Sequence, residues 1–350
     1  MKILFLGSYS GLFTDLQTGL KELGHESSIV VIGDNWQKQN ADLTFRNSSN
    51  VLHKIIKPIQ EYLFCSSLQK YDRIILQSPF LFSRRFGLNE TLINKILSYH
   101  PHCYLSAAGT DAYSWKCYQS LKYNPYHDLI DNNSDHTFYS SLKSYEWNKS
   151  LANRVKGIIP IAYTYAEAYK KLPNLQASIP IPINLSNYKY SPITANNKII
   201  VFHGITRQGF KGTKYIKKAF ELVSKLYPND FEFILKGNMT INEYKKIMEK
   251  SHLIVDQCNS YGYGVNGVIA LAMGKILLSG AEPEFLKDLN VTDCPVYNII
   301  PCVDQIVKTL VNLLNQKKSF NDLGLKSRDY VNNVHDHLKI THKYIKALSL

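Results

Sequence analysis

Apolar runs alternate with amphipathic stretches along the first half of the chain. The apolar runs lie at residues 2–7, 27–32, 73–76, 103–106 and 157–160, and helical periodicity separates them, most clearly at 12–23, 51–67 and 89–99. Strands that alternate with helices form a parallel sheet with helices on its faces. The pattern therefore predicts a doubly wound, Rossmann-like α/β domain over residues 1–180.

Pro180, Pro182 and Pro192 interrupt this periodicity, and we interpret residues 181–197 as a linker. Apolar runs and helical stretches then alternate again, at 198–202, 213–226, 231–235, 241–250, 253–255, 265–273 and 276–279. This predicts a second, smaller Rossmann-like domain over residues 198–330. The pattern is helical once more from 323 to 348, and we expect the segment 331–350 to form a C-terminal helix that packs back on the first domain.

The composition is that of a globular chain with a strongly basic surface. Of the 350 residues, 45% are hydrophobic, 20% are charged, and the formal net charge is +13. Such a charge attracts nucleic acid, anionic lipid headgroups or phosphorylated substrates. Lys and Arg form no consecutive block, so we do not expect a nucleic-acid partner. No apolar run approaches the roughly 18 residues of a membrane helix. We expect a cytoplasmic protein, with the inner face of the membrane as an alternative location.

The stretch from Val201 to Lys214 contains the strongest candidate chemistry. It reads VFHGITRQGFKGTK and lies between an expected strand and an expected helix. Its glycines allow a ligand to approach closely, and Arg207 and Lys211 place two cations near a helix N-terminus. These features predict an anion site suited to phosphate. The alternative is an ordinary βα loop with solvated charges, because the spacing is neither a P-loop nor a dinucleotide fingerprint.

Polar or glycine residues also follow three strands of the first domain, at 7–11, 77–83 and 107–111. Ligands of such sheets bind at the carboxyl ends of the strands. Gly11 lies in the first of these loops, and Asp111 ends the element Gly109-Thr110-Asp111 in the loop that follows the strand at 103–106. A helix N-cap is the favoured role for Asp111, and a catalytic carboxylate is the alternative.

Further motifs follow in the second domain. After the loop with His203, Gly204, Arg207 and Lys211-Gly212-Thr213 come Asp256-Gln257, Tyr263-Gly264-Val265 and the run Ala270 to Lys275. In this order, and with two Rossmann-like domains, the chain resembles GT-B glycosyltransferases, and more narrowly the GT4-type group of bacterial glycosyltransferases. The resemblance covers the whole chain as architecture, whereas its specific motifs lie in the second domain.

The resemblance implies that the second domain holds a nucleotide-diphosphate-sugar donor and the first a glycan or lipid-linked acceptor. It also implies a retaining, metal-independent reaction in the synthesis of bacterial surface polysaccharide or lipopolysaccharide, with no cofactor besides the donor. If the reaction inverted instead, Asp111 would be the candidate base. The donor-binding residues that it implies are Gly11, His203, Gly204, Arg207, Lys211, Asp256, Gln257, Tyr263, Gly264 and Val265.

Arg207 and Lys211 have a catalytic role in this interpretation. Negative charge accumulates on the departing nucleotide diphosphate, and fixed cations there stabilise the transition state more than the ground state. We expect removal of either cation to weaken diphosphate binding without unfolding the protein.

The sequence also departs from the family pattern. Such families often carry two glutamates, one for the sugar and one for the ribose, where this chain has Tyr261 and Ile269. An isoleucine accepts no hydrogen bond, so a ribose contact would be missing, and Glu282 and Glu284 are candidate substitutes. A histidine is often found at the position of Ala108. These departures leave a second hypothesis open, a catalytically silent homologue that acts as a binding or scaffold subunit.

Cations and aromatic residues of the first domain form a candidate membrane contact. They are Lys54, Lys57, Arg84 and Arg85 with Tyr62, Phe64, Phe80, Phe82 and Phe86. An anionic membrane surface attracts each Lys or Arg by about 1 kcal/mol. The favoured alternative is a set of ordinary core aromatics beside solvated charges.

Overall fold

The chain divides into two compact units, each built on its own parallel sheet. The computed structural model describes residues 1–8, 10–33, 41–47, 50–126, 128, 134–193, 198–205 and 209–349, without the side chains of 51–55 and 134–136. One unit comprises Met1–Cys117, Asp135–Pro182 and His337–Leu350, and the other comprises Tyr118–Ser134 and Ile183–Asp336. The predicted α/β class, with two Rossmann-like domains and C-terminal helices, is confirmed.

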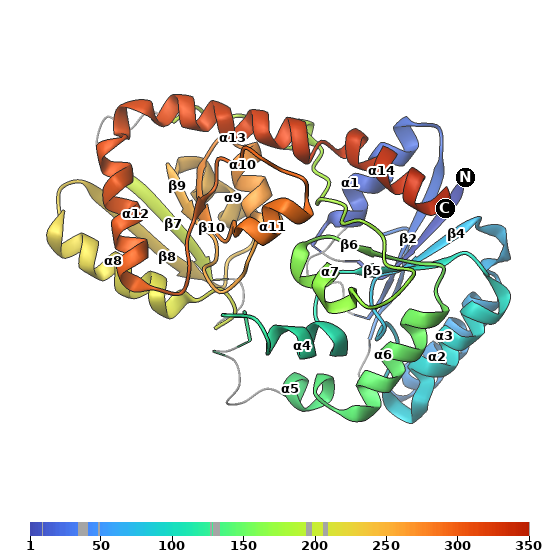
Figure 1. The fold of residues 1–350 in the computed structure, drawn as a ribbon. Coiled ribbons are helices and arrows are strands. Elements are labelled where there is room, and N and C mark those ends of the chain that lie inside the picture. The colour runs from blue at the N-terminus through green and yellow to red at the C-terminus, as the bar shows by residue number, and fades with distance from the viewer. Residues whose placement is uncertain are drawn as a thin grey trace. The chain divides into compact units, whose positions relative to one another are not determined.

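The first unit has a six-stranded sheet in the order β3-β2-β1-β4-β5-β6, in which all neighbouring pairs are parallel (Figure 1). Its strands are β1 (Lys2–Leu6), β2 (Glu26–Ile32), β3 (Leu43–Phe45), β4 (Arg73–Leu76), β5 (Cys103–Ala107) and β6 (Gly157–Pro160). The helices between them are α1 (Leu12–Glu22), α2 (Val51–Ser66), α3 (Leu88–Tyr99), α4 (Ala112–Tyr118), α5 (Ser134–Tyr139), α6 (Leu142–Arg154) and α7 (Tyr163–Tyr169). Helices cover both faces of the sheet, which is why its central strands are continuous apolar runs.

Helix α14 (His337–Ser349) belongs to the first unit and packs against α1. Gly19 of α1 permits the close approach, because a Cβ atom at this position would meet the Thr341 hydroxyl oxygen at 2.2 Å. The Leu348 carbonyl oxygen accepts hydrogen bonds from the Arg73 side chain at 2.7 Å and from the Tyr104 hydroxyl at 3.0 Å. The helix is therefore part of the packed body of this unit.

The second unit has a five-stranded parallel sheet in the order β11-β10-β9-β7-β8. Its strands are β7 (Ile199–Ile205), β8 (Phe231–Gly237), β9 (Leu253–Val255), β10 (Ile276–Ser279) and β11 (Tyr297–Asn298). Its helices are α8 (Thr213–Leu226), α9 (Ile241–Lys250), α10 (Val265–Ala272), α11 (Pro283–Asp288), α12 (Val303–Asn315) and α13 (Phe320–Val334). Helix α8 packs against α12, and α10 packs against α13.

The two units differ from the expected division in three places. The first is the expected linker 181–197, since the second unit begins at Ile183. Residues 118–134, expected in the first domain, belong to the second unit. The helical pattern from 323 to 348 breaks at His335 and Asp336, so that α13 ends in the second unit and α14 begins in the first. Hydrophobic periodicity reports that a segment is helical, but it does not report which sheet the helix covers.

Helix α2 carries a buried carboxyl group on its inner face. Glu61 is 1% exposed, and neither of its oxygen atoms has a hydrogen-bond partner among the described residues. The Nζ atom of Lys57, one turn earlier, lies 3.6 Å from the Glu61 carboxylate. Burial raises the pKa of Glu61, and the Lys57 charge offsets this only in part. The ionised form of Glu61 therefore costs free energy of folding.

We predict that Glu61→Gln raises the melting temperature at pH 7. Because the pKa of Glu61 is raised in the folded state, its carboxylate destabilises the fold once the pH exceeds the ordinary pKa of 4.5. The gain, about 1–3 kcal/mol at neutral pH, should disappear as the pH falls below that value. Thermal unfolding at several pH values measures it, with Glu146→Gln at an exposed position as the control. A lower melting temperature of Glu61→Gln at pH 7 would show that the ion pair with Lys57 outweighs the burial cost.

Candidate functional site

Three loops of the second unit meet at one edge of its sheet. Strands β10, β9 and β7 are parallel neighbours, so the residues that follow them come together. These residues, 209–212 before α8, 256–264 before α10 and 280–282 before α11, are called the strand-end loops below. Open α/β sheets bind their ligands at the carboxyl ends of the strands. The motifs that the sequence singles out in this half therefore lie where a ligand of this sheet is expected.

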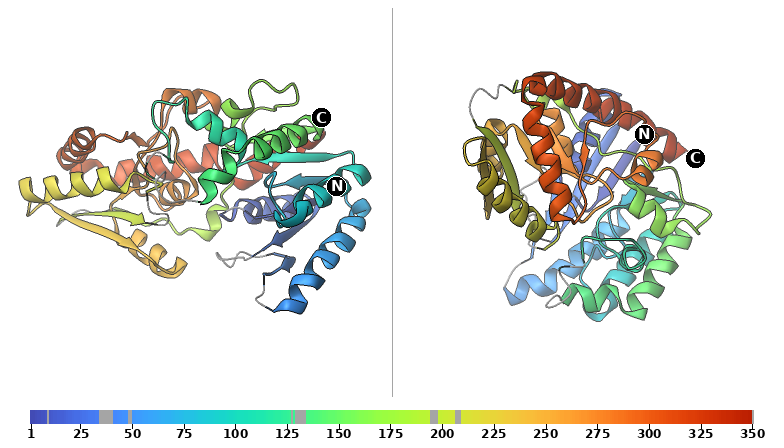
Figure 2. Two further views of the ribbon diagram at one scale, coloured as in Figure 1. Left: turned by 90° about the horizontal axis from the view of Figure 1, so that it is seen from below. Right: turned by 60° about the vertical axis from the view of Figure 1, so that its left-hand side comes forward.

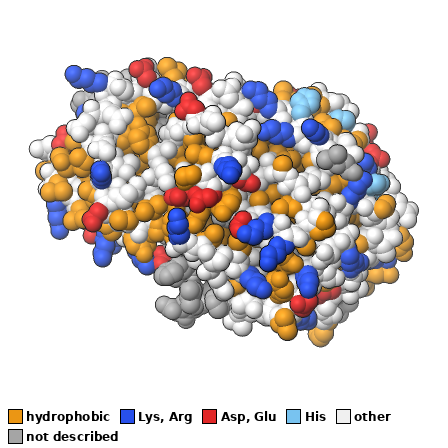
Figure 3. Space-filling view, in the orientation of Figure 1, with side chains coloured by type: hydrophobic (Ala, Val, Ile, Leu, Met, Phe, Trp, Pro, Cys, Tyr) orange, Lys and Arg blue, Asp and Glu red, His pale blue; other side chains and the backbone are white. Residues whose placement is uncertain are grey.

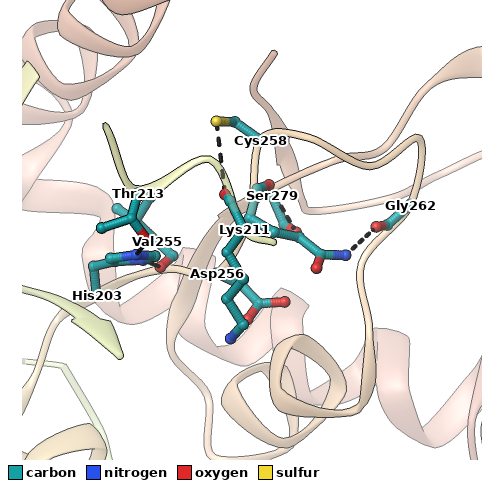
Figure 4. A network of polar contacts seen from close by, with 9 residues as sticks. His203, Lys211, Thr213, Val255, Asp256, Cys258, Gly262 and Ser279 are labelled. Atoms are coloured by element: carbon teal, nitrogen blue, oxygen red, sulfur yellow. Dashed lines mark hydrogen bonds and ion pairs between the residues drawn. The ribbon is translucent and has the colours of Figure 1, made fainter. Parts of the chain in front are cut away.

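A buried ion pair joins two of the strand-end loops. The Nζ atom of Lys211 lies 2.7 Å from Oδ1 of Asp256, and the two residues are 6% and 3% exposed (Figure 4). Burial opposes the charge on Lys211, but the Asp256 carboxylate outweighs it and holds the pKa of Lys211 above its ordinary value. The Lys211 carbonyl oxygen also accepts a hydrogen bond from the backbone N–H of Cys258 at 3.1 Å. Lys211 therefore fixes the loops to each other, and its charge is compensated where it lies.

His203 and Gly204 serve packing around the same loops. Nδ1 of His203 donates to the Val255 carbonyl oxygen at 2.7 Å, which leaves Nε2 to accept from the Thr213 hydroxyl at 2.9 Å (Figure 4). Burial and the nearby Lys211 charge lower the pKa of His203 to about 4, so the imidazole is neutral. A Cβ atom on Gly204 would meet the Tyr244 ring at 2.2 Å. These two residues thus link β7 to β9, α8 and α9.

Gln257 and Tyr263 shape the loop before α10 from within. Nε2 of Gln257 donates to the Gly262 carbonyl oxygen at 2.7 Å and closes the loop on itself. The Tyr263 hydroxyl contacts the Tyr330 hydroxyl and lies 3.0 Å from Nε2 of His335, so its ring is buried towards α13. The side chain of Tyr263 is therefore occupied by the fold, and the backbone of the loop is the part that can meet a ligand.

Helices α8 and α10 both begin at a glycine in the strand-end loops. Gly212 is the N-cap of α8 and Gly264 is the N-cap of α10, and neither helix has a side-chain cap hydrogen bond. The first N–H groups of a helix have no acceptor within it and, with the helix dipole, favour an anion. A Cβ atom at Gly264 would meet nothing within 4 Å, so the space in front of Val265, the first residue of α10, is open.

The other predicted catalytic residues have different outcomes. Arg207 lies outside the described residues. In the first unit, Asp111 is buried, and its Oδ1 accepts from the backbone N–H of Ser114 at 2.7 Å while its Oδ2 accepts from the Tyr169 hydroxyl at 2.6 Å. Burial raises the pKa of Asp111. These are the contacts of a helix cap, which is the role that the sequence favours for this residue.

Gly11 and Ala108 lie at strand ends of the first unit. Gly11 is the N-cap of α1, with a left-handed backbone at φ 82°, and a Cβ atom there would meet nothing within 4 Å. Ala108, where the family often has histidine, is buried. At these strand ends of the first unit, the backbone at Gly11 is accessible to a ligand. Position 108 carries no histidine, and the Asp111 carboxylate does not face solvent.

Tyr261 and Glu282, both discussed from sequence, are joined by a residue that the sequence does not single out. The Tyr123 hydroxyl donates to Oε1 of Glu282 at 2.8 Å, and its ring centroid lies 5.1 Å from that of Tyr261. Asn298 donates to the same oxygen of Glu282 at 2.8 Å. Glu282 is thus held by the fold. Ile269, at the position where the resemblance predicts a ribose contact, is half-buried on α10.

Asp128 and Tyr126, which lie in the same segment as Tyr123 (Tyr118–Ser134), also contact the strand-end loops and α8. Oδ1 of Asp128 lies 2.6 Å from Nζ of Lys214, and its Oδ2 accepts from Nδ2 of Asn259 at 3.1 Å. The rings of Tyr126 and Phe210 meet edge to face, with centroids 5.5 Å apart. Sequence reasoning missed these residues because they precede their partners by more than 80 positions (214 − 128 = 86) and no motif marks them.

Neither a metal-binding cluster nor a membrane-spanning helix occurs in the part of the chain that the structure describes. Over the described stretches of the chain, no group of three or more His, Cys, Asp or Glu side chains could hold a metal ion. Over the same stretches, no helix is long and apolar enough to cross a bilayer. Figure 3 shows Lys and Arg side chains scattered over the visible face rather than gathered into one stripe.

Comparison with known proteins identifies the fold. No family model and no curated protein sequence matches the chain. Among solved structures, HepE from Anabaena with UDP and glucose has a TM-score of 0.66 at 11% identity, over 99% of both chains. A glycosyltransferase from Rickettsia africae has a TM-score of 0.60 at 14% identity, over 99% of this chain and 97% of that one. Sucrose-phosphate synthase from Thermosynechococcus elongatus has a TM-score of 0.62 at 12% identity, over 99% and 97%. The GT-B fold predicted from the sequence is confirmed.

We predict that Lys211→Met destabilises the protein by about 3–5 kcal/mol, because it leaves the Asp256 carboxylate buried and unpaired. This revises the sequence-based expectation that Lys211 can be removed without cost to folding. The double variant Lys211→Met/Asp256→Leu should recover most of the loss, and chemical denaturation of the two single variants and the double variant measures the coupling. Lys217→Ala is the control, since the side chains of Lys217 and its partner Glu221 are 62% and 57% exposed and their ion pair is expected to contribute only about 0–1 kcal/mol. A Lys211→Met protein as stable as the wild type would contradict a structural role for the pair.

Proposed function

We propose that the protein is a glycosyltransferase whose second unit binds a nucleotide-diphosphate sugar at the strand-end loops. The observation that carries this proposal is the pair of helix N-termini at Gly212 and Gly264, which begin from neighbouring strands and are capped by no side chain. A diphosphate is the anion suited to two adjacent helix ends. The same fold in HepE was solved with UDP, which supports a UDP-sugar as the donor class to test first.

The chemistry of transfer fits these groups. When the glycosidic bond to the donor breaks, charge develops on the departing diphosphate, and fixed dipoles there lower the barrier. The charge of Lys211 is compensated by Asp256. Among the described residues, the N-termini of α8 and α10 therefore contribute the larger part of the positive electrostatic potential that would act on a diphosphate. Arg207 is the remaining proposed cation. The reaction so described needs no metal ion.

The acceptor is proposed to bind to the first unit. We infer a retaining reaction, because both oxygens of Asp111 are engaged within the fold and this residue is therefore a poor base. In a retaining reaction the departing phosphate can itself accept the acceptor's proton. A glycan or lipid-linked acceptor, in the synthesis of a bacterial surface polysaccharide or lipopolysaccharide at the inner face of the membrane, is the pathway we propose.

A second candidate function is a catalytically silent homologue that binds a donor or a partner. Two positions favour it, since Tyr261 packs against Tyr123 and Ile269 cannot accept a hydrogen bond from a ribose. Donor binding without hydrolysis or transfer would support this alternative. Release of free UDP in the presence of UDP-sugar and an acceptor extract would support the enzyme.

We predict that Gly264→Leu abolishes UDP binding without loss of stability. Gly264 has an extended backbone at φ −107° that any residue can adopt, and its Cβ position is open. A leucine there would project into the space in front of α10. Binding of UDP, UDP-glucose and UDP-N-acetylglucosamine can be measured as a rise in melting temperature.

Gly264→Ala is the graded control and should weaken binding less than Gly264→Leu. Lys225→Gln, at an exposed position in the last turn of α8, controls for charge and should bind like the wild type. If the wild type binds no UDP-, GDP- or dTDP-sugar, or if Gly264→Leu binds UDP unchanged, the proposed donor site is wrong.

We also predict that Ile269→Glu tightens UDP binding about tenfold or more, because a charged hydrogen bond to the ribose is worth about 1.5–3 kcal/mol. The gain should be absent with 2′,3′-dideoxy-UDP, which lacks the ribose hydroxyls, and isothermal titration with both nucleotides tests this. Equal gains with both nucleotides would indicate a different cause. A destabilised variant would show that residue 269 is part of the core.

A further inference from the structure

Strand β8 lies at the edge of the second unit's sheet and is paired on one side alone. The order β11-β10-β9-β7-β8 places it beside β7, and no strand follows it among the described residues (Figure 1, Figure 2). An edge strand presents a row of backbone N–H and C=O groups that can pair with another strand. Strand β8 is seven residues long and contains no proline, so this row is uninterrupted.

The other three sheet edges formed by the described residues are protected. Strands β3 and β11 are edges of only three and two residues. Strand β6 is covered by the segment that follows α7. The Ile158 N–H donates to the Asn174 carbonyl oxygen at 3.0 Å, and the Gln176 N–H donates to the Ile158 carbonyl oxygen at 2.9 Å. Natural proteins shorten or cover edge strands to prevent unwanted pairing. Strand β8 is neither short nor covered, which makes it the candidate for pairing with another chain.

Alternate residues of β8 direct their backbone groups away from β7. The Ile199 N–H donates to the Asp230 carbonyl oxygen at 2.7 Å, and Ile199 lies opposite Phe231 in the parallel register. In a parallel ladder, this bond identifies the even-numbered residues of β8 as those that bond to β7. The N–H and C=O groups of Phe231, Phe233 and Leu235 therefore point outward, and no described loop bonds to them.

The side chains of β8 carry a self-complementary pattern of charge. Glu232 and Lys236 are exposed, and they lie on one face of the strand at equal distances from the half-buried Ile234. The opposite face packs on α8, where the ring centroids of Phe233 and Phe220 lie 4.4 Å apart. The charges are therefore on the face that is turned away from α8, with an apolar residue midway between them.

A second copy of β8 can pair with the first as an antiparallel neighbour related by a two-fold axis. The register that overlaps all seven residues centres on Ile234, and it also places Glu232 of each copy opposite Lys236 of the other. Because even-numbered residues bond to β7, they form the non-hydrogen-bonded pairs of this new ladder, in which facing Cα atoms are about 4.5 Å apart and side chains meet. A register centred on Glu232 or on Lys236 would instead oppose like charges.

We propose that β8 is the interface of a homodimer in which two copies of this chain join the sheets of their second units edge to edge. The outward backbone groups supply the hydrogen bonds that give affinity in strand addition, and the two Glu232–Lys236 pairs fix the register. The same strand serves in both copies and its edge is consumed, so the assembly closes at two chains. A second copy is favoured over an unrelated strand because the charges of β8 complement those of β8 itself.

Sedimentation velocity of the full-length protein, from submicromolar to high micromolar concentrations, measures the assembly. We expect the wild type to form a dimer of two 40.1-kDa chains. Glu232→Lys and Lys236→Glu should each weaken the dimer about tenfold or more, because each change replaces two attractive pairs with two repulsive ones. The exchange Glu232→Lys/Lys236→Glu makes the facing charges opposite again and should restore the dimer, which a general folding defect would not do.

Two further variants test the backbone pairing and the register. Leu235→Pro removes an outward N–H and should give a monomer, whereas the ladder with β7 keeps its hydrogen bonds. Ile234→Cys brings two thiols together at the two-fold axis, at a Cα separation of about 4.5 Å that a disulfide can span. Mild oxidation should therefore link the Ile234→Cys dimer covalently. The control Leu142→Cys, at a position of α6 that is 74% exposed, should stay unlinked.

Charge reversals elsewhere control for the change in net charge. Glu146→Lys on α6 and Lys326→Glu on α13 change exposed residues, and both variants should remain dimeric. A wild type that stays monomeric over the whole concentration range would overturn the proposal, as would assemblies larger than a dimer. A dimer that persists in Leu235→Pro and in both charge reversals of β8 would overturn it by placing the interface elsewhere. None of these outcomes depends on the proposed donor site, because β8 lies outside the strand-end loops.

Discussion

The buried ion pair between Lys211 and Asp256 is the constraint on which the rest of the candidate site depends. It connects the loop after β7 to the loop after β9. The Cys258 N–H bonds the same two loops to each other, and His203 links the adjoining strands β7 and β9 and the start of α8. A pair buried in this way contributes little net attraction for a ligand, because each charge is already compensated. Its value lies in the fixed positions of the two helix ends behind it, since a preorganised dipole needs no rearrangement when charge develops.

Tyr261 and Ile269 stand where the resemblance to GT-B glycosyltransferases predicts two glutamates. At the first position Tyr261 presents an aromatic ring, and Tyr123 covers that ring while holding Glu282. A carboxylate that could have approached a ligand is thereby committed to protein contacts. Tyr123 comes from the first half of the chain, whereas Tyr261 and Glu282 come from the second half. Two distant parts of the sequence therefore form this cluster in the second unit.

The sequence predicts most of the fold because strand and helix periods are local properties. Helix α8 begins at Thr213 and ends at Leu226, the bounds that the pattern indicates, and the N-cap role favoured for Asp111 agrees with its contacts. The burial of Lys211 could not be predicted from the local sequence. It depends on Asp256, which lies 45 positions later in the chain and 2.7 Å away in the fold. Tyr123 and Asp128 were missed for the same reason.

The course of the chain has a consequence for biosynthesis. The chain passes between the units after Cys117, Ser134, Pro182 and Asp336, so the first unit receives α14 only after the whole second unit has been made. Domains usually fold in the order in which the ribosome releases them. Here the sheet that is synthesised first waits for the helix that is synthesised last, with Gly19 and the apolar face of α1 uncovered in the meantime. A chaperone would therefore matter most to this protein during synthesis, while the first unit still lacks α14.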